Sequence, residues 1–183
     1  FQAEDGIRDV AVDWSSDVCS SDLDEESERG RAARERIGAG LLKNVARMFR
    51  TSGLQLGYHY EDSPVCVADG TPPPVDDPEN YVPTARPGSR APHVPLVEGR
   101  STLDCFGRGF VLLRLGDAPD AGPLAKAARD RRMPLEVVSL AQPEVRRAYE
   151  RALVLVRPDG HVAWRGDTVP ADPVAVIDRI RGA

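Results

Sequence analysis

Apolar residues recur at helical spacing near the start of the chain. Between residues 24 and 50 they follow one another at intervals of three or four, which places them on one face of a helix: Ala33, Ile37, Leu41, Val45 and Met48. We expect a break or bend near Gly38 and Gly40, because each glycine weakens a helix interior by up to about 1 kcal/mol relative to alanine. Gly53 is the expected C-cap of this helix.

The spacing then changes from helical to alternating. Four apolar residues are separated by single polar or small ones, as on one face of a strand: Leu54, Leu56, Tyr58 and Tyr60. A short strand is therefore predicted to end near residue 60.

A proline-rich stretch follows between residues 61 and 95. Nine of the sixteen prolines lie there, and proline lacks the amide donor that regular structure needs. The composition is compatible with a disordered linker and with an ordered, irregular arm that lies across another surface. Four residues favour the arm, since a solvated linker seldom carries them: Tyr81, Val82, His93 and Val94.

The clearest pattern begins at Gly109. It predicts four strands, over residues 109–115, 135–140, 153–157 and 161–165. The helix expected between the first two strands implies a parallel pair with a right-handed crossover. Pro158-Asp159-Gly160 predicts a tight turn, so the last two strands form a hairpin. With further helices over residues 143–151 and at the C-terminal end, the order is β-α-β-α-β-β-α, and by analogy we expect an α/β, thioredoxin-like domain.

The predicted helices of this domain begin at residues suited to capping. Asp117 or Asp120 can cap the helix over residues 124–132, and Pro143 suits the first turn of the next one. Asp172 is expected to cap the last helix, whose apolar face is formed by Val174, Ile177 and Ile180. The chain thus divides into residues 1–23, a helix and strand over 24–60, the arm over 61–100 and the thioredoxin-like domain over 101–183.

The net charge of −5 comes from the first residues alone. Residues 1–23 hold six acidic residues and one basic residue, so the rest of the chain has 23 of each and is neutral. This segment resembles a translated sequencing-adapter read-through, a string that recurs at the ends of fragmentary metagenomic genes, and we set it aside as artefactual and disordered. A natural, poorly ordered acidic N-terminus is the alternative.

Several classes of function are not expected. The basic residues form no stripe with interleaved aromatic residues, which argues against nucleic-acid binding. No apolar run approaches the roughly 20 residues of a membrane span, and the acidic N-terminus lacks a secretory signal, so we expect a cytoplasmic protein. Gly38-Ala39-Gly40 lacks the third glycine of a dinucleotide loop and follows no strand.

Cysteine and histidine chemistry is also not expected. A thiol redox site needs a reactive thiolate in the loop after the first strand, and residues 116–123 contain no cysteine. Cys66 and Cys105 are therefore predicted to be packed structural residues. The histidines lie on separate elements without ligand spacing, so no metal site is predicted. His161 is expected to face solvent, and His93 to make a positioning hydrogen bond.

Three stretches together resemble one family. They are residues 53–65 (GLQLGYHYEDSPV), residues 81–96 (YVPTARPGSRAPHVPL) leading into 101–113 (STLDCFGRGFVLL), and residues 152–167 (ALVLVRPDGHVAWRGD). In this order and spacing they are similar to the C-terminal part of class A flavoprotein monooxygenases, of the phenol, chlorophenol and polyketide hydroxylase type. The likeness extends from about residue 30 to the end of the chain.

The resemblance implies a parent enzyme that hydroxylates an aromatic ring with FAD and NAD(P)H, the flavin doing the chemistry. The family's FAD motifs do not occur in this sequence, so it implies no catalytic, cofactor-binding or metal residue here. The chain is then a fragment that is structural and not catalytic by itself. Its implied partner is the missing N-terminal FAD and substrate body, of which residues 24–60 resemble the terminal helix and a short strand. Subunit contact in a homodimer is a further role that the resemblance suggests.

One set of residues matches the family's arm motif. The resemblance implies a structural role for it, in backbone turns and charge-assisted bonds that tie the arm to the body: Arg86, Pro87, Gly88, Arg90, Pro92 and His93. The alternative function is a stand-alone interaction module on a redox-inactive thioredoxin-like fold. We further expect residues 109–183 to fold independently, and the helix over residues 24–50 to expose an apolar face that lacks its partner.

Overall fold

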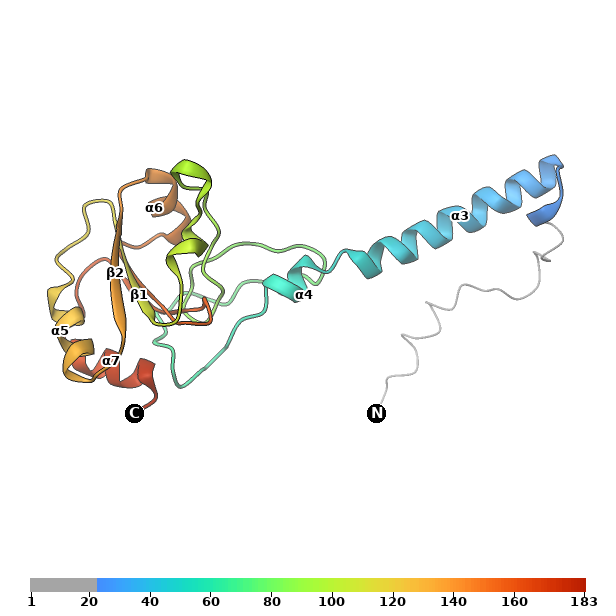
Figure 1. The fold of residues 1–183 in the computed structure, drawn as a ribbon. Coiled ribbons are helices and arrows are strands. Elements are labelled where there is room, and N and C mark those ends of the chain that lie inside the picture. The colour runs from blue at the N-terminus through green and yellow to red at the C-terminus, as the bar shows by residue number, and fades with distance from the viewer. Residues whose placement is uncertain (1–22) are drawn as a thin grey trace, which may run out of the picture. The chain divides into compact units, whose positions relative to one another are not determined.

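A computed structural model describes residues 23–183 of the chain. It divides into two compact units, Phe1–Thr51 and Ser52–Ala183, which are described one at a time. Figure 1 shows the long helix of the first unit and the sheet with its helices in the second. The predicted artefactual segment, residues 1–23, lies outside the described residues except for Leu23.

The helix predicted near the start of the chain is confirmed. It is α3, Glu28–Phe49, with 22 residues. Ser27 caps its first turn, because the hydroxyl oxygen accepts a hydrogen bond from the amide of Gly30 at 3.2 Å. On the exposed side of α3, the Arg31 guanidinium forms an ion pair with the Glu35 carboxylate one turn later, at 2.6 Å.

Two details of the predicted helix are wrong. α3 continues without a break through Gly38 and Gly40, because both glycines keep a helical backbone. The C-cap residue is Arg50, whose amide donates to the carbonyl of Ala46 at 3.0 Å, rather than Gly53.

The strand predicted over residues 54–60 is also wrong, since Ser52–Leu56 forms a short helix, α4. The cause is a long-range contact. The Ser52 hydroxyl donates to the carbonyl of Glu79 at 2.8 Å and accepts from the amide of Tyr81 at 3.1 Å. The alternation of apolar residues cannot reveal these bonds, because the partners of Ser52 lie 27 and 29 positions later in the sequence.

The four predicted strands are confirmed and lie in the order β2-β1-β3-β4. Their bounds are Phe110–Leu115 for β1, Leu135–Leu140 for β2, Leu153–Val156 for β3 and Val162–Gly166 for β4. β1 is parallel to β2 and antiparallel to β3, and β3 forms the predicted hairpin with β4. The register of this hairpin shifts between Leu155 and Val156. With its helices the sheet has the element order that the sequence predicted for an α/β domain.

Helices cover both faces of the sheet (Figure 1). They are α5 (Gly122–Asp130), α6 (Pro143–Tyr149) and α7 (Pro173–Arg181). Successive residues of β1 point to opposite faces. Leu112 packs with Leu124 of α5 and Ile177 of α7, whereas Leu113 packs with Val145 of α6. Each face therefore has its own apolar core.

The caps of these helices were predicted only in part. Asp172 caps α7 as expected, accepting a hydrogen bond from the amide of Ala175 at 2.9 Å. α5 begins at Gly122, so its cap position falls on Ala121, past both candidate aspartates, and the predicted side-chain cap from Asp117 or Asp120 is wrong.

The apolar face predicted for α7 also needs one correction. Ile177 and Ile180 are buried, but Val174 is exposed. Val174 lies in the first turn of α7, next to the capping Asp172, where the helix has not yet reached the core of the sheet.

Residues 61–100, the predicted arm, take an irregular path of turns, bends and isolated bridges. The arm lies along β4: the amide of Val67 donates to Ala163 at 2.8 Å and that of Gly88 donates to Val162 at 2.7 Å. It thereby covers the backbone of an edge strand. Short 3-10 turns at Val97–Gly99 and Thr102–Cys105 then lead into β1.

Candidate functional site

The guanidinium of Arg86 joins three stretches of the arm. Its side chain is only 10% exposed, and its two terminal nitrogens donate to the carboxylate oxygens of Glu61 at 2.9 and 2.7 Å. Its Nε donates to the carbonyl of Thr71 at 2.9 Å. The hydrogen bonds from Arg86 lower the pKa of Glu61. Arg86 thus supplies charge-assisted bonds, as the resemblance implied, and these bonds lie within the arm.

Gly88 is the point where three backbone segments come together. Its φ is +93°, and a Cβ added there would lie 2.5 Å from the carbonyl oxygen of Tyr60. The carbonyl of Gly88 accepts from the amide of Tyr60 at 2.9 Å, and its amide donates to Val162 at 2.7 Å. Both the backbone angle and the close approach require glycine.

The carbonyl of Pro92 links the arm to the turn before β1 and to α6. Its carbonyl accepts hydrogen bonds from the hydroxyls of Thr102 and Tyr149, each at 2.8 Å. All three residues are buried. Burial raises the pKa of the Tyr149 phenol, so this hydroxyl stays a hydrogen-bond donor at neutral pH.

The other three motif residues differ in exposure. Pro87 is buried beside Arg86, while Arg90 is half-buried and pairs through its backbone with His161. His93 is exposed, and its side chain makes no hydrogen bond within residues 23–183. The positioning hydrogen bond predicted for His93 is therefore not found there. The six residues do not converge on one point, because the arm is extended through the motif.

His161 is buried and does not face solvent as predicted. Its ring packs against the rings of Tyr58 and Tyr60, with centroid distances of 5.3 and 4.9 Å. Neither ring nitrogen has a hydrogen-bond partner among the described residues, although Asp159 Oδ1 lies 3.5 Å from Nδ1. Burial lowers the pKa of His161, and the nearby Asp159 carboxylate opposes this shift. The prediction failed because the covering tyrosines are about a hundred residues away in sequence.

A buried ion-pair network was not foreseen from the sequence. Arg165 of β4 is 1% exposed at its side chain, and its Nε donates to Asp69 at 2.6 Å while Nη1 donates to Glu150 at 2.8 Å. Burial alone would raise the pKa of Asp69, but hydrogen bonds from Thr71 and Arg165 hold it below its usual value. Nothing in the local sequence marks Arg165, because its partners come from the arm and from the end of α6.

Of the cysteines that the structure describes, Cys66 and Cys105, neither lies in the loop after β1. Cys66 is buried in the arm, with its Sγ 3.8 Å from the carbonyl oxygen of Val162. Cys105 is half-buried before β1, and burial raises the pKa of its thiol. A raised pKa disfavours the reactive thiolate.

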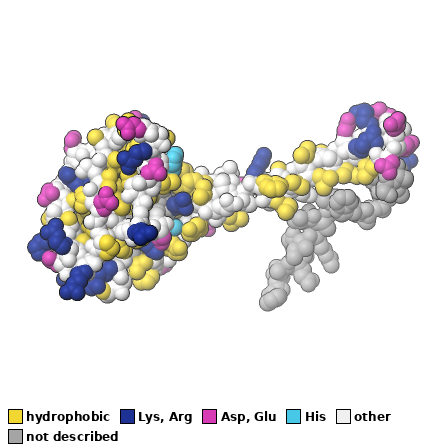
Figure 2. Space-filling view, in the orientation of Figure 1, with side chains coloured by type: hydrophobic (Ala, Val, Ile, Leu, Met, Phe, Trp, Pro, Cys, Tyr) yellow, Lys and Arg dark blue, Asp and Glu magenta, His cyan; other side chains and the backbone are white. Residues whose placement is uncertain are grey.

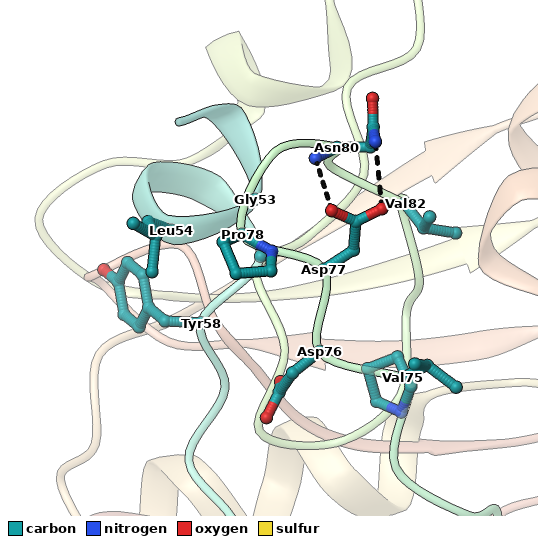
Figure 3. Close-up of a pocket in the computed structure, with 11 residues that line it drawn as sticks. Gly53, Leu54, Tyr58, Val75, Asp76, Asp77, Pro78, Asn80 and Val82 are labelled. Carbon is teal, nitrogen blue, oxygen red and sulfur yellow. Dashed lines mark hydrogen bonds between the residues drawn. The ribbon is translucent and has the colours of Figure 1, made fainter. Parts of the chain in front are cut away.

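A hollow of about 370 Å³ opens beside α4 (Figure 3). Its rim is apolar, with Leu54, Val75 and Val82 exposed. Its clearest polar group, Asp77, is already engaged by its own loop: the carboxylate accepts from the amide of Asn80 at 3.0 Å and from the side-chain amide of Asn80 at 2.9 Å. A second carboxylate, that of Asp76, also lines the hollow and is exposed, so the polar groups of the lining side chains include two carboxylates and no cation.

Residues 23–183 lack a metal-binding cluster and a membrane-spanning helix. No group of three or more histidine, cysteine, aspartate or glutamate residues is placed to hold a metal ion there. The described helices include none that is long and apolar enough to cross a membrane.

Residues 84–183 match the family described as aromatic-ring hydroxylase, C-terminal. The match covers more than half of the chain, and the chain therefore belongs to this family. It includes the whole arm motif, from Arg86 to His93, together with the sheet domain.

Curated relatives of the chain are monooxygenases by name. FAD-dependent monooxygenase apdD of Emericella nidulans is 40% identical over 137 residues, which are 70% of this chain and 22% of that protein. Tetracenomycin B2 monooxygenase-dioxygenase of Streptomyces olivaceus is 39% identical over 147 residues, 73% of this chain and 27% of that protein. The chain spans about a quarter of the length of these relatives.

Solved structures share the fold. The structure described as native and K252c-bound RebC-10x is 42% identical with a TM-score of 0.79, over 88% of this chain and 31% of that one. Aklavinone-11 hydroxylase in complex with FAD and aklavinone is 32% identical with a TM-score of 0.57, over 70% of this chain and 27% of that one. The mixed α/β fold matches a part of each larger enzyme.

Proposed function

We propose that this chain is the C-terminal part of an FAD-dependent aromatic hydroxylase, a monooxygenase that also uses NAD(P)H, and that it contributes structure rather than catalytic groups. One observation carries the proposal. About 40% identity to two monooxygenases, of which apdD is FAD-dependent by name, extends over 70% or more of this chain, yet covers only 22% of apdD and 27% of the tetracenomycin enzyme. The chain is thus similar to a minor part of each of these larger enzymes.

The described residues do not fit an FAD site. Arg86 and Arg165, which could bind a phosphate, are buried and already bonded to carboxylates. The hollow beside α4 has no free cation, and its Asp77 carboxylate would repel a pyrophosphate. FAD and NAD(P)H would therefore be held by the N-terminal body of the parent enzyme, which is the partner that we propose for this chain.

A flavin measurement tests the lack of cofactor binding. Purified from cells supplied with FAD, the chain is expected to be colourless, with no flavin absorbance after denaturation. Flavin in a one-to-one ratio with protein would contradict the proposal.

The coding DNA upstream of Asp24 tests the parent enzyme. We expect an open reading frame that continues upstream and encodes a GxGxxG sequence after a predicted strand. A native start codon directly before Asp24 would instead support the stand-alone interaction module.

A further inference from the structure

One edge of the sheet in the second unit is open. β2 is the outermost strand of the order β2-β1-β3-β4, and it pairs with β1 alone. The opposite edge, β4, is covered by the arm: the amide of Gly88 donates to Val162 at 2.7 Å, and the amide of Val162 donates to Ser89 at 2.9 Å. The chain thus closes one edge of its sheet with its own backbone, and among the described residues it leaves the other edge without a partner strand.

The hydrogen bonds to β1 fix which backbone groups of β2 face outward. The carbonyls of Pro134 and Leu140 accept from amides at the two ends of β1. Because successive residues of a strand direct their backbone groups to opposite sides, the even-numbered residues of β2 bond to β1. Leu135, Val137 and Ser139 therefore present their amides and carbonyls at the open edge, where no other described residue forms a hydrogen bond with them.

β2 lacks the features that protect an edge strand from pairing. Natural edges are interrupted by lysine, proline, a bulge or an inward-pointing charge. β2 has the sequence LEVVSL, with Glu136 as its single charged residue, and its register with β1 continues over all six residues. Val137, at the middle of the strand, is 41% exposed. The edge is therefore regular, and its centre is apolar.

We propose that β2 pairs with β2 of a second copy of this chain, antiparallel and about a two-fold axis at Val137. In this register Val137 lies opposite Val137 of the second copy and Leu135 lies opposite Ser139, so all the outward amides and carbonyls of the three residues find partners. Moving the axis to Glu136 would set two carboxylates opposite each other. Moving it to Val138 would pair Leu135 with a residue beyond the end of β2.

The single open edge argues for a closed pair of copies. A sheet with two open edges can add further sheets without limit, whereas a sheet with one open edge is complete after one pairing. A two-fold pairing also requires a surface that complements itself. The outward residues of β2 meet this requirement, because they are spaced evenly on both sides of Val137. The inference uses the sheet unit alone and does not rest on the proposed function.

Sedimentation equilibrium of the whole chain tests the inference. The unsubstituted chain, with a monomer mass of 19.9 kDa, is expected to approach twice that mass as its concentration rises. Val137→Lys should weaken the association roughly tenfold or more, because two ammonium groups would face each other across the axis. Val174→Lys is the matched control and should leave the association unchanged, since Val174 is similarly exposed, at 37%, but lies on α7. Circular dichroism checks that both variants fold.

A different association surface would give a different result. Figure 2 shows hydrophobic side chains along one side of α3, where Leu42, Met48 and Phe49 are exposed. Association through that helix would not distinguish Val137→Lys from Val174→Lys. A dimer that Val137→Lys leaves as stable as the control does, or a chain that stays monomeric at every concentration, overturns the inference.

Disulfide trapping tests the register. In Val137→Cys the two new cysteines would lie opposite each other, with Cα atoms about 5.5 Å apart, which a disulfide can span. Under mild oxidation this variant is expected to form a covalent dimer much faster than Ser139→Cys, whose cysteine would face Leu135 of the second copy. The unsubstituted chain shows what the native cysteines contribute. Equal trapping of the two variants would overturn the pairing about Val137.

Discussion

At the scale of single residues, the arm motif acts through backbone geometry and buried charge. Gly88 bonds both to Tyr60, in the segment after α4, and to Val162 of β4. Its φ is +93°, and its Cα lies close to the Tyr60 carbonyl. The guanidinium of Arg86 donates hydrogen bonds to the Glu61 carboxylate and to the Thr71 carbonyl. Removing one partner of such a buried pair leaves an uncompensated charge. This loss destabilises the fold more than replacing both partners by apolar residues would.

Gly88→Ala is expected to lower the free energy of unfolding by about 3 kcal/mol or more. The positive φ contributes about 1–2 kcal/mol and the clash with the Tyr60 carbonyl a similar amount. Gly99→Ala is the matched control, because Gly99 also has a positive φ, +73°, but open space around it. Urea unfolding at pH 7 measures both variants, and an equal loss for the two would show that the contact at Tyr60 contributes nothing.

His161 predicts a pH dependence of stability. Its pKa is lowered in the folded protein, so the unfolded chain takes up a proton first as the pH falls below about 6.5. The contribution is therefore fully present above about pH 6.5 and is lost as the pH falls toward the lower, folded pKa. His161→Phe keeps an aromatic ring against Tyr58 and Tyr60 but cannot titrate.

Unfolding curves recorded from pH 7 to pH 5 check this expectation. The His161→Phe variant should lose less stability over that range than the unsubstituted chain. His93→Gln serves as the control, since His93 is exposed and should leave the slope unchanged. If stability decreases equally from pH 7 to pH 5 in the unsubstituted chain and in both variants, His161 is not the cause of the decrease.

At the scale of elements, the arm is part of the sheet domain. It bonds along β4, and its Ala85, Ala91 and Val94 are buried in the same core as α6. Without the arm, the edge of β4 would be open and these core contacts would be lost. The compact unit accordingly begins at Ser52, well before residue 101 or residue 109.

Truncation tests how far the domain depends on the arm. Residues 52–183 are expected to unfold cooperatively, whereas residues 101–183 should be less stable by several kcal/mol and prone to aggregate. The reason is the loss of buried apolar groups together with the exposure of an edge strand. Equal unfolding midpoints for the two chains would restore the sequence-based expectation that residues 109–183 fold independently.

At the scale of the whole molecule, the two units differ in what they bury. The sheet unit has a core on each face, whereas Leu42, Met48 and Phe49 are exposed in the second half of α3. A helix in water draws most of its stability from packing an apolar face, and among the described residues nothing buries these three side chains. The two units should therefore differ in their resistance to unfolding.

Limited proteolysis is expected to cleave within the first unit before the second. Fragments that begin near Ser52 and reach the C-terminal end should accumulate, and mass spectrometry identifies them. Preferential survival of the part before Thr51 would contradict this picture of the two units.

The sequence by itself determined the elements that depend on local pattern and chemistry. Continuous apolar runs mark β1 and β3, the turn at Pro158 to Gly160 marks the hairpin, and Asp172 marks the start of α7. These signals work because strand period, turn geometry and capping involve residues only a few positions apart. The family resemblance likewise rests on contiguous motifs, and the match over residues 84–183 confirms its coarser part, the aromatic-ring hydroxylase, C-terminal family.

Only the tertiary structure decided the features that join distant residues. The helix at Ser52 is held by a loop 27 positions away, His161 is covered by Tyr58 and Tyr60, and Arg165 finds Asp69 in the arm. None of these partners is marked by the spacing of its neighbours. The energy of a buried charge or ring depends on which segment covers it, and that is set by the fold of the whole unit and not by local pattern.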